Sequence, residues 1–196
     1  AYAVQNSFNA ISVDGETSTN DAFIGINSGK KIDKKFLPII QSGIDIVCQN
    51  LAKNIARDGE GANCLLEVVV EGAKHNDDAI KIAKSICNSV LVKTAIHGCD
   101  PNWGRIISAA GNSGIKFKLN AVDLYIGDHL ILRKGKLNHY DPQKVTDYMK
   151  SRMQGEYLVE DIVRIVLNLN SGKYKGTAWG CDLSKKYVVI NSEYTT

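Results

Sequence analysis

Apolar residues follow two different spacings along the chain. From Phe36 to Ile55 they recur every three or four positions, which predicts an amphipathic helix of about five turns. Gly59 follows this segment and is the predicted left-handed residue at its end. Asp77 and Asp78 begin a second predicted helix, because acidic side chains suit the positive end of a helix dipole.

Shorter runs rich in valine, isoleucine and leucine predict strands. The first two runs flank a polar turn at 14–21, and another two flank Gly127-Asp128, so each pair is a predicted hairpin. Asp141-Pro142 predicts a further helix start, and residues 106–110 a short helix. The predicted strands are 10–13, 22–26, 65–70, 90–95, 122–126, 129–132, 159–169, 177–183 and 187–190.

This mixture of hairpins and helical crossovers predicts an α+β fold. We expect a layered α/β sandwich of mainly antiparallel or mixed sheets flanked by helices. A weak, glycine-rich seam near 111–114 divides the chain into two predicted lobes, 1–112 and 113–196.

Composition narrows the class of protein. The chain has 196 residues, 44% of them hydrophobic, which is enough for a real core. The 24 basic and 21 acidic residues give a net charge of +3, too balanced to indicate nucleic-acid binding. No apolar run reaches the roughly 18 residues of a membrane helix.

Five cysteines, none at CxxC spacing, favour reduced thiols over a disulfide scaffold. There is no signal peptide, so we expect a cytoplasmic protein. The chain begins at Ala1 without methionine, which fits a processed or a trimmed product.

The residues alone give no complete catalytic set. His97, Cys99 and Asp100 are close in sequence but have no second ligand pair, so no metal site is expected. Residues two apart rarely form a Cys-His pair, which argues against Cys99 as nucleophile. A Gly-x-Ser-x-Gly turn is also absent from the sequence.

Three segments are candidates for recognition, each with a structural alternative. Glu60 lies between two glycines, where the backbone could approach a ligand closely and the carboxylate could pair with an ammonium group; the alternative is a plain turn. The segment 100–105 is either a structural loop or part of a site. The tail 191–196 is either a polar end or a ligand contact.

These segments together resemble the β chain of the ornithine acetyltransferase (glutamate N-acetyltransferase) family of arginine-biosynthesis bifunctional proteins. They occur in the family's order and span nearly the whole chain. The matching segments are SFN (7–9), VDGETSTND (13–21), ARDGEGA (56–62), AKSI (83–86), LVKTA (91–95), DPNWGR (100–105), AWGCDL (178–183) and the tail 191–196.

The resemblance implies an acetyltransferase fold and mechanism. A precursor cleaves itself before a threonine, whose hydroxyl then takes the acetyl group of N-acetylornithine and passes it to glutamate in a ping-pong cycle. Ornithine and N-acetylglutamate are the products. A Thr-Gly pair of the α chain supplies the oxyanion hole. No cofactor is implied, and acetyl-CoA is a candidate second donor, as for some family members.

The family's site residues map onto this chain in part. Glu60, Asn191 and Thr196 are the implied substrate-binding residues. No catalytic residue is expected in the chain itself, because the nucleophilic threonine should lie upstream of Ala1. The implied partner is the α chain of the same precursor, in a heterotetramer of two α and two β chains, with no nucleic acid and no membrane.

Two other functions stay open from the sequence. One is a related-fold, self-processing aminopeptidase, which the DPNWG run disfavours. The other is a non-catalytic binding protein built on the same fold.

Overall fold

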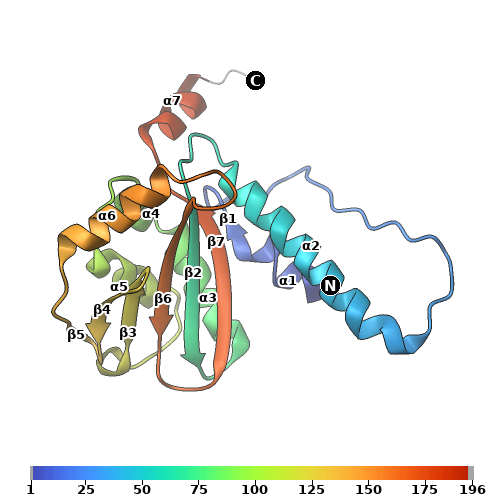
Figure 1. Ribbon diagram of the computed structural model, residues 1–196, viewed down its shortest axis with the longest axis horizontal. Coiled ribbons are helices and arrows are strands. Elements are labelled where there is room, and N and C mark those ends of the chain that lie inside the picture. The colour runs from blue at the N-terminus through green and yellow to red at the C-terminus, as the bar shows by residue number, and fades with distance from the viewer. Residues whose placement is uncertain (1, 194–196) are drawn as a thin grey trace.

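The computed structural model describes residues 2–193 and contains one seven-stranded sheet (Figure 1). The strands lie in the order β1-β7-β2-β6-β3-β4-β5. β7 pairs antiparallel with β2 and parallel with β1, while β2 and β6 are parallel, so the sheet is mixed. The strands are β1 (Ile11–Ser12), β2 (Leu65–Ala73), β3 (Asp123–Ile126), β4 (His129–Arg133), β5 (Lys136–Leu137), β6 (Ile162–Asn168) and β7 (Tyr174–Cys181).

Helices cover one face of this sheet and form the main core with it. α3 (Asn76–Asn88), α4 (Val90–His97), α5 (Trp103–Gly111) and α6 (Pro142–Met153) all bury side chains there. Strand β2, between β7 and β6, is buried on both faces at Val68 and Val69, which explains the apolar run 68–70.

A second, smaller cluster lies on the other face. The end of α2 (Leu37–Arg57) approaches the sheet at β1 and β7, and α1 (Tyr2–Gln5) packs against α2. Ala56 packs there with Leu65 and Trp179. In Figure 1 the rest of α2 extends away from the sheet, beside a long loop formed by the residues that precede it.

Most of the predicted elements are confirmed. The long helix is α2, the second is α3, and Asp141 caps α6 by accepting a hydrogen bond from the Gln143 amide. The predicted hairpin at Gly127 is β3–β4. The α+β fold with a mixed sheet is therefore as expected.

Four local predictions are wrong. Residues 10–26 form no hairpin, since β1 is only two residues long and pairs with β7. The predicted strand 90–95 is helix α4 and the predicted strand 187–190 is helix α7 (Lys185–Glu193). Gly59 is not left-handed; the positive φ, +69°, is at Gly61.

The two wrong strand predictions share a cause. Both segments are short and rich in β-branched residues, and a short apolar run does not by itself distinguish strand from helix. Ser89 caps α4 by accepting from the Val92 amide, and Val92 and Ile96 then face the core one turn apart. Tertiary packing thus outweighs local preference.

The predicted lobes 1–112 and 113–196 both contribute strands to the same sheet. The division stays a prediction. No helix in residues 2–193 is long and apolar enough to cross a membrane.

Candidate functional site

Glu60 lies in the turn between α2 and β2, with its side chain exposed. Asn191 of α7 meets it there, donating a hydrogen bond from Nδ2 to Glu60 Oε2 over 2.5 Å. Two of the three residues predicted to bind substrate are thus adjacent, although 131 positions separate them. The third, Thr196, lies outside the described residues.

The two glycines beside Glu60 have a different role from the predicted one. A Cβ on Gly59 would lie 2.8 Å from Cys181 Sγ, and a Cβ on Gly61 would lie 2.9 Å from both Ser184 Oγ and the Tyr187 amide nitrogen. The close approach is therefore to the protein's own C-terminal segment and not to a ligand. The positive φ of Gly61 adds a second reason for glycine there.

Ser184 joins this turn to α7. Its hydroxyl donates to the Gly61 carbonyl oxygen over 2.7 Å and accepts from the Tyr187 amide over 3.4 Å. The second contact places Ser184 as the N-cap of α7. One side chain thus contacts both the Glu60 turn and the helix that carries Asn191.

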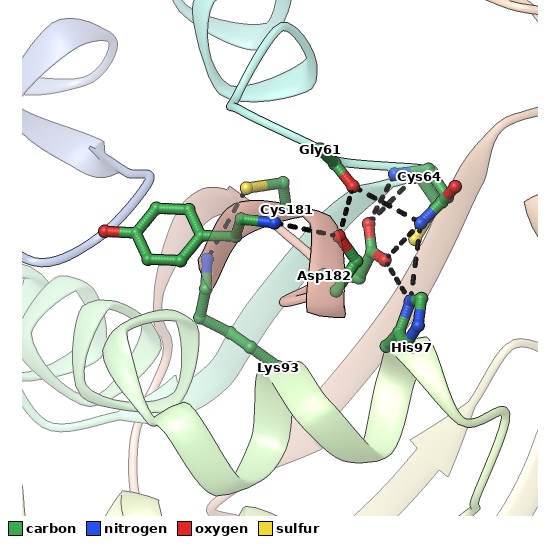
Figure 2. Close-up of polar contacts among 9 residues, drawn as sticks. Gly61, Cys64, Lys93, His97, Cys181 and Asp182 are labelled. Carbon is green, nitrogen blue, oxygen red and sulfur yellow. Dashed lines mark hydrogen bonds and ion pairs between the residues drawn. The ribbon is translucent and has the colours of Figure 1, made fainter. Parts of the chain in front are cut away.

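Asp182 fixes the other end of the same turn (Figure 2). Its buried carboxylate accepts from the amides of Asn63, at 2.6 Å, and Cys64, at 3.1 Å. The second oxygen accepts from Asn63 Nδ2 at 2.9 Å and lies 2.8 Å from His97 Nδ1. A buried carboxylate with this many partners holds the first residues of β2 in place.

Lys93 and Cys181 form a second buried contact nearby (Figure 2). The lysine Nζ lies 3.5 Å from Cys181 Sγ, and the lysine carbonyl oxygen accepts from the Leu183 amide. These two contacts attach α4 to the residues that lead into α7.

Burial disfavours four of the five cysteines as nucleophiles. Burial raises the pKa of Cys64, Cys181 and Cys99, and that of Cys87 to about 12. The reactive form of cysteine is the thiolate, and a raised pKa keeps the thiol protonated near neutral pH. His97 faces Asp182, so the sequence argument against a Cys99–His97 pair agrees with the geometry.

Three carboxylates, those of Asp14, Glu16 and Glu60, act on Tyr187 and are here called the acidic rim of the turn. Burial, followed by the charges of Asp14 and Glu60, raises the pKa of Tyr187, and Glu16 adds to the effect. The loop after β1, the Glu60 turn and the start of α7 meet here, since a Cβ on Gly59 would lie 3.0 Å from Val13 and a Cβ on Gly61 would lie 2.9 Å from the Tyr187 amide nitrogen. This concentration of carboxylates suits a cationic group.

The segment 100–105, which leads into α5, supports the helices around it. Asn102 caps α5 by accepting from the Arg105 amide. The Arg105 guanidinium donates to the Leu91 carbonyl oxygen, at 3.0 Å, and to Thr94 Oγ1. These contacts join α5 to α4 and favour the structural alternative for this segment.

Several of these residues were missed by the sequence reasoning. Asp182 and Lys93 were read only as parts of predicted strands and of motifs, and Ser184 was assigned to no element and no motif. The sequence around Ser184 has an N-cap type residue before the run 185–193, a signal that the β-branched residues obscured.

Comparison with known proteins decides the family. The model of the ArgJ family matches residues 1–196. The chain belongs to the ArgJ family. A curated ArgJ family protein of Prochlorococcus marinus subsp. pastoris, an "arginine biosynthesis bifunctional protein", is 84% identical over all 196 residues. Its counterpart in Dehalococcoides mccartyi is 48% identical over 200 residues, covering 99% of this chain.

A solved ArgJ family structure agrees with the fold. The crystal structure of the arginine biosynthesis bifunctional protein of Bacillus halodurans superposes with a TM-score of 0.91 at 40% identity. The match covers 98% of this chain and 90% of that crystal chain. In contrast, the chain spans about half the length of the curated relatives it matches, 49% and 47% for the two named above.

Proposed function

We propose that this chain is the β subunit of a self-processed acetyltransferase that moves acetyl from N-acetylornithine to glutamate in cytoplasmic arginine biosynthesis. The observation that carries the proposal is the meeting of Glu60 and Asn191 in a chain of the ArgJ family. Both positions match the substrate-binding positions of the motifs described above. The related aminopeptidase is disfavoured by the family match.

The chemistry of these side chains suits an amino-acid substrate. The Glu60 carboxylate can pair with an ammonium group, and the acidic rim adds to its attraction. Asn191 uses one Nδ2 hydrogen on Glu60 and another on the Tyr187 carbonyl oxygen. Its Oδ1 is left as an acceptor for a substrate amine.

The acetyl transfer itself would use a threonine upstream of Ala1 and an oxyanion hole from the α chain. A threonine hydroxyl attacks the acetyl carbonyl, the C–N bond to ornithine breaks, and ornithine leaves with the proton. The amine of glutamate then attacks the threonyl ester and releases N-acetylglutamate. No cofactor takes part in this scheme.

A partner chain is the proposed occupant of the exposed face of α2. Ile39 is 70% exposed and Ile46 is 57% exposed, and other large apolar side chains of α2 are similar. A helix with so much exposed apolar surface marks an interaction site. Because the chain covers about half of its curated relatives but 90% of a crystal chain, the remaining half of the precursor, the α chain, is the partner that fits.

We expect Ile46→Glu in the full-length protein to disrupt assembly of the two chains, because it would bury a carboxylate without a partner. Size-exclusion chromatography with subunit analysis would detect the loss. Leu137→Glu is the matched control, since Leu137 is 58% exposed on β5 at the opposite edge of the sheet. Equal assembly of both variants would contradict this use of α2.

The function itself is tested with the product of the complete gene. N-terminal sequencing should find that the β chain begins with threonine. N-acetylornithine alone should then add one acetyl group to the β chain, as seen by intact-mass analysis. Glutamate should then remove it. Peptide cleavage without acetyl transfer would favour the aminopeptidase, and neither activity would favour a binding protein.

A further inference from the structure

A closed ring of contacts holds the two recognition residues together. Glu60 precedes Gly61, whose carbonyl oxygen accepts from Ser184. Ser184 caps α7, and Asn191, seven positions later in that helix, donates a hydrogen bond to Glu60. The ring joins two segments more than 120 positions apart through the side chains of only three residues.

The rest of the turn leaves little freedom for this ring. Asp182, two residues before Ser184, accepts from the amides of Asn63 and Cys64, so it holds the segment that follows Gly61. Gly61 also packs too closely on Ser184 for a side chain to fit between them. The segment 182–184 therefore contacts the Glu60 turn at two places, at Gly61 through Ser184 and at Asn63 and Cys64 through Asp182.

We propose that Ser184 is a positioning residue that sets Glu60 opposite Asn191 for binding of the amino-acid substrate. This inference rests on the proposed function. Ser184 does not face the substrate, because its hydroxyl hydrogen is used on Gly61 and its oxygen accepts from Tyr187. Ser184 acts through the backbone of the turn, and loss of its hydroxyl should change the position of the Glu60 side chain.

The test is a double-mutant cycle in the full-length enzyme. Ser184→Ala should raise the KM for N-acetylornithine about fivefold to tenfold with little change in kcat, as expected for one lost hydrogen bond and cap. In a Glu60→Gln background the same change should have almost no effect, because the residue on which it acts has already lost its charge. Ser184→Thr keeps the hydroxyl and should recover most of the affinity.

Ser151→Ala is the matched control, since the Ser151 hydroxyl donates to the Tyr148 carbonyl oxygen within α6, away from the Glu60 turn. Hydrogen exchange supplies a readout independent of activity. Ser184→Ala should speed exchange of the amides at 61–64 and at the start of α7, and Ser151→Ala should not.

The outcomes separate this proposal from the proposed function. Additive effects of Ser184→Ala and Glu60→Gln, or unchanged exchange at 61–64, would overturn the positioning role. If Glu60→Gln alone leaves the kinetics unchanged while exchange still rises in Ser184→Ala, the assignment of Glu60 fails and the inference fails with it, but the structural contact stands.

Discussion

Glu60→Gln in the full-length enzyme is expected to lower kcat/KM for N-acetylornithine by about 10- to 150-fold. The change removes one charge and keeps the shape of the side chain. A hydrogen bond to a charged group contributes roughly 1.5–3 kcal/mol, which corresponds to that range. The amide oxygen introduced at this position is expected still to accept from Asn191, so the turn should keep its conformation.

Asp58→Asn is the matched control for this prediction. Asp58 is an exposed carboxylate in the same turn, and it is the C-cap residue of α2. We expect it to change kcat/KM by less than about twofold, because an exposed charge that does not touch the ligand is screened by solvent. Steady-state kinetics with both substrates would check the pair. Equal effects of the two variants would mean that Glu60 acts only through the general field of the acidic rim.

The Glu60 site was only partly predictable from the sequence. Glu60 and Asn191 could be proposed because they lie in recognisable motifs, but their contact across 131 positions could not. Local patterns report which face of a helix or strand is buried. They do not report which distant segments meet, and so the role of Gly59 and Gly61 was assigned to a ligand when it belongs to the contact with Cys181 and Ser184.

The fold was easier to predict where the pattern was long. The α2 helix spans 21 residues with a continuous three-to-four spacing, and the β2 run is buried on both sides. α4 and α7 are eight and nine residues long. At that length β-branched residues suggest strand, and only capping and packing decide for helix.

Buried polar contacts between elements were also hidden from the sequence. Arg57, at the end of α2, was read as part of the motif 56–62, and Asp161 as part of the predicted strand 159–169. In the structure their side chains pair, with Arg57 Nε donating to Asp161 Oδ2 over 2.6 Å, and only 6% and 5% of the two side chains exposed. The pair attaches the last residue of α2, close to the Glu60 turn, to the residue before β6.

Breaking this pair from one side is expected to be costly. Asp161→Ala should lower the free energy of unfolding by about 3–5 kcal/mol, because it leaves a buried guanidinium without its carboxylate. Among residues 2–193, Arg57 would retain the hydrogen bond from Nη1 to Asn54 Oδ1 and its position over the Tyr157 ring. Urea denaturation of the assembled protein should show a lower midpoint at an unchanged slope.

The double variant Arg57→Met/Asp161→Leu separates the charge from the packing. Replacing both members of a buried ion pair with apolar residues of similar volume is often neutral, so we expect it to recover most of the stability lost in Asp161→Ala. If it is as unstable as Asp161→Ala, the site depends on the hydrogen bonds of the pair and not on the unpaired charge. If it is stable but its KM for N-acetylornithine rises, the ion pair also sets the position of the turn that carries Glu60. A stable double variant with unchanged KM would confine the pair to stability, and would leave Ser184 and Asp182 as the contacts that hold the turn in place.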